Sequence, residues 1–233
     1  MRDDPEVTHI EGDPPLAVHW RRSARARRMS LKVSRLDGQI TLTLPRRASL
    51  RAGMAFLKER HDWLHEVARG LEPPSMVAPG TRLPVEGRLL TVTPAPVRSA
   101  RIDDDRLLVP EARPAAGAMA FLKHLARDRL ASRVSAHARG IDRSPGKLTL
   151  RDTRSRWGSC TAAGDLMFNW RLVMAPPSIL DYVAAHEVAH LVHMDHSAAF
   201  WSLCEHLFPD TARARAWLKA EGAHLHRFRF ASG

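Results

Sequence analysis

Alternation of apolar and polar residues is the first regular feature of the chain, and it is typical of strands that bury one face. The alternating or apolar segments lie at residues 16–20, 29–33, 40–44, 89–92 and 107–109. Asp37-Gly38, between the second and third of these segments, favours a hairpin turn. The first half of the chain therefore predicts short strands joined by tight turns.

Helical spacing, in which every third or fourth residue is apolar, interrupts the strands twice. One helix is expected from the capping residue Ser49 through Val67, with Gly70 as its stop. A longer helix is expected from Ala115 to about Ala138. These helices give the apolar faces of the strands something to pack against.

A second group of short strands, at residues 148–151, 157–161 and 166–170, indicates an antiparallel meander. A Pro-Pro pair follows it. A further helix should begin next, since Ser178 and Asp181 form a capping-box pattern. The second half of the chain thus predicts a small sheet followed by helices.

Together these patterns predict an α+β fold of small antiparallel sheets, in three parts. Residues 1–15 are acidic, contain proline and predict a loose tail. Residues 16–112 are expected to form a β-rich region with one helix. Residues 113–233 are expected to form the second domain, which contains the meander and the helices after it.

Composition narrows the class of protein. The 233 residues are 44% hydrophobic and 26% charged, as in a globular chain. No run of 18 apolar residues is present, so no membrane span is expected. The first residues lack the apolar core of a secretory signal. Two cysteines are too few for a disulfide scaffold, which predicts a cytoplasmic protein.

The distribution of charge suggests a class of binding partner. The chain has 36 basic and 25 acidic residues, a net charge of +11. The densest basic patch, with no acidic residue inside it, comprises Arg21, Arg22, Arg25, Arg27 and Arg28. Such a run is a candidate contact for nucleic acid or a nucleotide. An arginine-rich composition with a solvated surface is the alternative.

The second half of the chain contains the pattern His186-Glu187-Val188-Ala189-His190. Four residues make just over one helical turn, so both imidazoles project from the same face of a helix. Two nitrogens on one face can bind one metal ion. Glu187 lies beside this line and can accept a proton from metal-bound water. The pattern therefore predicts a catalytic metal site.

An open catalytic site needs a third protein ligand, and four residues compete for that position. His193 lies roughly 10 Å along the helix axis from His186, which is too far for one ion. His196 is favoured, because a turn after Asp195 would bring it back toward the metal. Glu205 and His206, on the next helix, remain open.

With these residues in view, the chain resembles the YgjP-like metallopeptidase-domain family, a zincin-like group similar to the Wss and SprT-type metalloproteases. The resemblance covers roughly residues 17–222, and Asp195 departs from it where asparagine is expected. It implies a zincin-like fold, a Zn²⁺ cofactor, His196 as the third ligand and Glu187 as the general base. Besides an arginine-rich N-terminal hairpin, the matching runs lie at residues 154–160, 166–172, 181–183, 186–190, 196–197, 200–201, 209–210 and 217–219.

In such folds an edge strand pairs with an extended substrate, so the run at 156–159 resembles a substrate-binding edge. The expected substrate contacts are Arg156, Trp157, Gly158, Ser159 and Asn169. A purely structural interpretation is equally open, with the tryptophan in the core, the glycine at a bulge and the arginine in an ion pair. Asn169 can brace the site or simply cap a strand.

The sequence therefore favours a zinc metallopeptidase that acts on a peptide or protein substrate. Two other functions remain open. One is a metal-dependent nucleoside triphosphate pyrophosphatase, since an arginine-rich surface suits polyphosphates, although no Gly-rich phosphate loop is visible. The other is a nucleic-acid-associated binding module that uses Arg21–Arg28.

Overall fold

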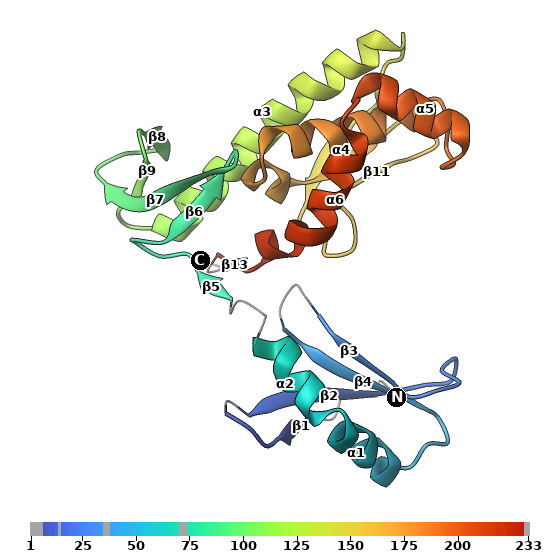
Figure 1. Ribbon diagram of the computed structural model, residues 1–233. Coiled ribbons are helices and arrows are strands. Elements are labelled where there is room, and N and C mark those ends of the chain that lie inside the picture. Colours follow the sequence, from blue (N-terminus) through green and yellow to red (C-terminus); the bar gives the residue numbers. More distant parts are fainter. Residues whose placement is uncertain (1–6, 14, 35–37, 70–73, 231–233) are drawn as a thin grey trace. The chain divides into compact units, whose positions relative to one another are not determined.

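Figure 1 shows the computed structural model of the chain, which describes residues 7–13, 15–34, 38–69 and 74–230. The chain divides into two compact units, Met1–Pro74 and Ser75–Gly233. The sequence placed the boundary at 112/113 instead. The difference arises because Leu83, Leu90 and their neighbours bury their side chains in the same core as the C-terminal helices.

The N-terminal unit contains a four-stranded mixed sheet of order β1-β2-β4-β3. Its strands are β1 (Val7–Ile10), β2 (Leu16–Ser23), β3 (Ser30–Val33) and β4 (Ile40–Pro45). The central strands β2 and β4 pair in parallel, and both outer pairs are antiparallel. The expected loose tail at 1–15 is corrected at β1, whose backbone pairs with β2 from Val7 to Ile10.

Two helices, where the sequence predicted one, cover this sheet. Helix α1 (Leu50–Glu59) begins at Ser49, whose Oγ accepts a hydrogen bond from the amide of Ala52 at 3.1 Å, so the predicted cap is confirmed. Helix α2 (His61–Arg69) follows a break at Arg60. The fully or nearly fully buried side chains between helices and sheet are Val18, Trp20, Ile40, Leu42, Leu44, Leu57 and Leu64.

The C-terminal unit begins with β5 (Ser75–Met76), which pairs in parallel with β13 (Phe228–Arg229). A second four-stranded mixed sheet follows, of order β6-β7-β9-β8. Its strands are β6 (Arg82–Val85), β7 (Arg88–Ala95), β8 (Arg101–Asp103) and β9 (Arg106–Pro110).

Helix α3 (Pro114–Gly140) is the longest element of the chain, and it is predicted almost to the residue. It packs against β9, α4 and the 3₁₀ helix η1 (Trp170–Met174), and its length is visible in Figure 1. One narrow face is buried, at the four-residue spacing of a helix in a core. That face comprises Ala118, Leu122, Ala126, Leu130, Val134 and Ala138.

The three strands predicted for the meander are present, but they do not pair in the predicted antiparallel order. Strands β10 (Leu148–Arg151), β11 (Gly158–Cys160) and β12 (Leu166–Asn169) form a sheet of order β10-β12-β11. β12 pairs in parallel with β10 and antiparallel with β11. The most buried strand, which carries Leu166 and Phe168, takes the centre, and this corrects the expectation of purely antiparallel sheets.

The remaining helices are α4 (Pro177–Ala189), α5 (Ala198–Leu207), α6 (Thr211–Glu221) and the 3₁₀ helix η2 (Gly222–His226). α4 packs against α3, α5, α6 and β11, so it lies at the centre of the unit. Ten of its thirteen residues are buried. A central, rigid helix is well suited to hold side chains in fixed positions.

The predicted capping box at the start of α4 does not form. The N-cap is Pro176, and no side chain caps the first turn. Asp181 instead accepts hydrogen bonds from Arg133 and, at 2.7 Å, from His137 on α3. The Asp181 carboxylate, which the local pattern assigned to the helix cap, instead pairs with side chains distant in the sequence.

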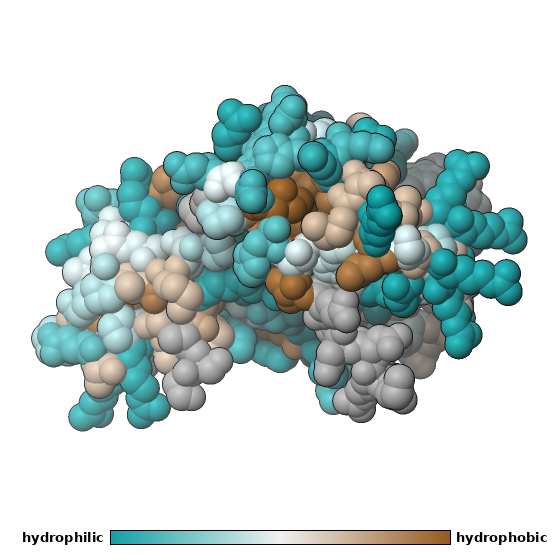
Figure 2. All heavy atoms as spheres, turned by 90° about the horizontal axis from the view of Figure 1, so that it is seen from below, coloured by the Kyte–Doolittle hydropathy of each residue, from teal (hydrophilic) through white to brown (hydrophobic). Residues whose placement is uncertain are grey.

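Hydrophilic side chains cover most of the face shown in Figure 2, with smaller apolar groups between them. Among the described residues, no helix has both the length and the apolar composition needed to cross a bilayer. The observed class is a mixed α+β fold with small mixed sheets.

Candidate metal centre

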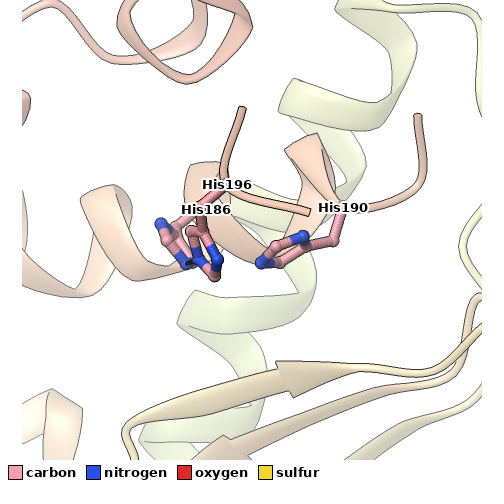
Figure 3. A group of neighbouring side chains, drawn as sticks. All are labelled: His186, His190 and His196. Atoms are coloured by element: carbon pink, nitrogen blue, oxygen red, sulfur yellow. Dashed lines mark hydrogen bonds between the residues drawn. The ribbon is translucent and has the colours of Figure 1, made fainter. Parts of the chain in front are cut away.

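Three histidine side chains converge at the carboxyl end of α4. His186 lies in the last turn of the helix, His190 is its C-cap residue, and His196 follows in the loop before α5. Figure 3 shows the three rings turned toward one another. One nitrogen from each ring lies within 4.8 Å of the other two. Helix α4 ends at Ala189, earlier than the turn expected after Asp195, and the loop that follows brings His196 back to the other two histidines.

The spacing of the nitrogens fits a metal ion. Nε2 of His186 and Nε2 of His196 are 3.3 Å apart. Two ligands held about 2.0–2.1 Å from one ion at a tetrahedral angle are separated by about 3.3–3.4 Å. The described carboxylates and thiols add no fourth ligand to the group. Three imidazoles that converge in this way form a donor set that can hold a metal ion.

The outer nitrogens of two rings have partners that orient them. Nδ1–H of His190 donates to the carbonyl oxygen of His193 at 2.9 Å, which leaves Nε2 free to face the cluster. Nδ1 of His186 lies 3.5 Å from the Tyr182 hydroxyl, one turn earlier on α4. His193 therefore contributes a carbonyl rather than the third ligand.

Burial favours the neutral form of His186 and His190. Desolvation, reinforced by the neighbouring His190 and His196, lowers the pKa of His186 to about 4. Desolvation also lowers the pKa of His190. A neutral imidazole has the free lone pair that a metal needs, so these two ligands require no proton loss at neutral pH.

Two aromatic side chains of α5 pack against the three histidine rings. The ring of Phe200, on α5, is fully buried, and its centroid lies 5.0, 4.5 and 4.8 Å from those of His186, His190 and His196. Trp201 packs against His196 at 5.6 Å. These contacts restrict the orientations of the three imidazole rings. Sequence reasoning missed them, because apolar residues in a helix have the same pattern whether they fill a core or support a site.

Glu187 is the buried carboxylate of the site, with 5% of its surface exposed. Burial raises its pKa to about 8, against the opposing positive charge of Arg156. A cation held by the histidines would favour the carboxylate form further. Such a group can exchange a proton near neutral pH.

Gly158 allows β11 to approach this carboxylate closely. A Cβ atom at residue 158 would lie 2.6 Å from Cγ and 2.8 Å from Cδ of Glu187, and closer still to Oε1. No side chain larger than hydrogen fits without displacement of Glu187. β11 is an edge strand, and among the described residues only β12 pairs with it. Gly158 therefore lets β11 lie directly against the side chain of Glu187.

The other expected substrate contacts lie around this strand, with different exposures. Arg156 is exposed, and Ser159 is half-buried on β11. Trp157 is half-buried and packs on His226, with ring centroids 5.2 Å apart. The arginine and the serine are therefore accessible, and the tryptophan has a packing role.

Asn169 makes bracing hydrogen bonds, one of the two roles that the sequence left open. Its side chain is completely buried. Nδ2 donates to the carbonyl of Thr153 at 2.7 Å, and Oδ1 accepts from the amide of Arg171 at 2.9 Å. The amide thus holds the loop before β11 against η1.

Cys160, also on β11, lies close to the site but is not an activated nucleophile. Desolvation, together with the negative charges of Glu187 and Asp165, raises the pKa of its thiol. A raised pKa lowers the thiolate fraction, and the thiolate is the reactive form. The buried carboxylate beside the histidines is the better candidate for acid–base chemistry.

Comparison with known proteins gives one match. The sequence model of the family described as YgjP-like, metallopeptidase domain, matches residues 27–221. No curated protein and no solved structure matches significantly. The match spans most of the chain and includes the histidine cluster, Glu187 and β11.

Proposed function

The chain belongs to the YgjP-like metallopeptidase-domain family, and from this premise we propose that it is a zinc-dependent peptidase with a zincin-like fold. His186, His190 and His196 would hold the ion, and Glu187 would act as the general base. The observation that carries the proposal is the convergence of three imidazoles at the spacing of a tetrahedral site.

Zinc bound there would supply a Lewis acid for the substrate carbonyl and a bound water of lowered pKa. Glu187 then has a defined task, because it is the buried carboxylate that follows His186 on α4. Its carboxylate accepts the proton of the attacking water and delivers it to the leaving amine. Burial raises its pKa to about 8 and a bound cation would lower it again, which suits both steps.

β11 gives the substrate a place to bind. An extended peptide can add to its free edge as a further strand, with main-chain hydrogen bonds to residues 158–160. The missing side chain at Gly158 keeps the peptide backbone close to Glu187. The exposed Arg156, two residues before this strand, would contact the same peptide. This arrangement favours peptide bonds over compact small substrates.

We also propose a cytoplasmic location. Cys160 and Cys204 are both free thiols, and Cys204 is fully buried. Free thiols persist in a reducing compartment. Alkylation of whole cells under non-reducing conditions would measure their state.

The substitution Glu187→Gln tests the proposed function. It keeps the shape of the side chain and removes the base. We expect zinc content, measured by elemental analysis, to stay near one ion per chain, while cleavage of denatured casein falls about 1000-fold. His196→Ala is the matched control, which should lose both zinc and cleavage.

Two results would contradict the proposal. If the purified wild-type protein contained no stoichiometric metal, the proposed metal site would be wrong. Hydrolysis of nucleoside triphosphates without peptide cleavage would keep the metal and replace the peptidase with a pyrophosphatase.

A further inference from the structure

The positive charge of this protein is concentrated in one segment of the N-terminal unit. Residues 16–58 contain eleven of the 36 basic residues and one of the 25 acidic residues. This segment therefore carries +10 of the net charge of +11, and the rest of the chain is nearly neutral. An arginine-rich composition would spread the charge along the chain, so it does not explain this distribution.

The sheet topology gathers these charges at one end. β2 and β4 are parallel, with Ser23 opposite Pro45, so their carboxyl ends lie side by side. Residues 24–29 leave this end of β2, and residues 46–49 leave the same end of β4. β3 starts there as well, since Ser30 pairs with Thr43. Two segments about twenty residues apart thus form one surface.

We call this surface the arginine patch. The first segment contributes Arg21, Arg22, Arg25, Arg27 and Arg28. The second segment contributes Arg46, Arg47 and Arg51. All eight side chains are exposed.

Two of these arginines stabilise the patch itself. Nη1 of Arg22 donates to the carbonyl oxygens of Arg46 at 3.2 Å and Ala48 at 2.7 Å, which ties the two segments together. Nε of Arg21 donates to Oγ1 of Thr43 at 2.9 Å. Among the described residues, none of the eight guanidinium groups pairs with a carboxylate. Six therefore remain available to an external anion.

We propose that the arginine patch binds the phosphate backbone of double-stranded nucleic acid. Six free guanidinium groups match a polyanion whose charges are closely spaced, and duplex DNA has one charge per about 1.7 Å of axis. Guanidinium groups also bind phosphate oxygens in bidentate fashion. The first turn of α1, which begins beside Arg47, adds amide groups and the positive end of a helix dipole.

The side chains of the patch favour a duplex over a single strand. Single-strand sites stack bases on exposed aromatic rings. Trp20, the aromatic residue next to the patch in the sequence, is 6% exposed and packs in the core. Contacts to phosphates without base stacking should be independent of sequence. Leu50 and Met54 are exposed on α1, so an anionic membrane is the competitor that the experiment must exclude.

The experiment measures binding of the full-length protein to a fluorescent 20-base-pair DNA duplex of arbitrary sequence at several NaCl concentrations. Six phosphate contacts predict that log K falls with log[NaCl] with a slope of about −5. The variant with Arg25, Arg27, Arg28, Arg46 and Arg47 changed to Gln should bind at least about 30-fold more weakly at 0.1 M NaCl, with a slope near −1.

A matched control removes the same amount of charge elsewhere. It changes five exposed arginines of the C-terminal unit to Gln, and its affinity should fall less than about threefold. Circular dichroism checks that both variants fold. The control residues are Arg82, Arg98, Arg101, Arg127 and Arg213.

Four results would overturn the proposal. Equal weakening in both variants would mean that net charge, rather than the patch, attracts DNA. A slope near zero would exclude phosphate contacts. Tighter binding to an unstructured single strand, or to phosphatidylserine vesicles, would assign the patch to that partner. None of these results depends on metal or peptidase activity, so the proposed function is tested separately.

Discussion

Gly158→Ala is the sharpest test of how closely β11 and Glu187 are fitted. The new Cβ would lie 2.6 Å from Cγ and 2.8 Å from Cδ of Glu187. Carbon atoms in favourable contact are about 3.5–4.0 Å apart, so the side chain or the strand must move by about 1 Å. Glu187 is 5% exposed and cannot swing freely into solvent.

The displacement should affect turnover more than stability or metal binding. A 1 Å misplacement of a catalytic group costs about 100-fold in rate. The three histidines keep their contacts, so zinc content should be unchanged. The assays are casein cleavage, elemental analysis for zinc, and thermal unfolding.

Gly140→Ala is the control, because it adds the same methyl group where the nearest atom outside its own helix, Cδ2 of Leu207, is 3.9 Å away. It should leave turnover unchanged. Full turnover in Gly158→Ala would refute the fit between strand and carboxylate. Loss of zinc together with turnover would show that the methyl group disturbs the whole site.

Two further predictions address the surroundings of the site. Phe200→Leu keeps an apolar side chain under the histidines but removes the ring that contacts all three, so we expect about tenfold weaker zinc affinity in competition with a chromophoric chelator; unchanged affinity would exclude a positioning role. His226 is buried, and desolvation, aided by the Arg171 charge, lowers its pKa to about 4. Its neutral form dominates in the folded state, so its contribution to stability is complete above about pH 6.5 and decreases as the pH falls toward 4, by about 3 kcal/mol. Urea unfolding across this range should show a shallower pH dependence in His226→Gln; identical dependence would refute the assignment.

The histidine cluster was predictable because the relevant geometry is local. His186 and His190 are one helical turn apart, and His196 needs only a helix end and a short loop to reach them. Phe200 was not predictable, since an apolar residue in a helix has the same pattern whether it fills a core or supports a metal site. Its role depends on three distances that no spacing in the sequence contains.

Some predictions from local patterns were wrong because residues distant in the sequence bind the same side chains. Asp181 fits a capping box with Ser178, yet Arg133 and His137, more than 40 residues earlier, bind its carboxylate. Asn169 fits a site residue in the family resemblance, yet it is completely buried and its amide bonds the carbonyl of Thr153 and the backbone amide of Arg171. Polar residues near a site therefore need a test of their hydrogen-bond partners before they are given a function.

The arginine patch is a second case in which the sequence alone misses residues that the fold brings together. A search along the sequence finds Arg21–Arg28 because those residues are contiguous, and it misses Arg46–Arg51 because only the parallel pairing of β2 and β4 brings them there. The second segment changes the physical argument, since it raises the number of guanidinium groups at one end of the sheet from five to eight. A variant that neutralises only the first segment would leave Arg46, Arg47 and Arg51 in place and would understate the contribution of the surface. A decisive experiment must change both segments together.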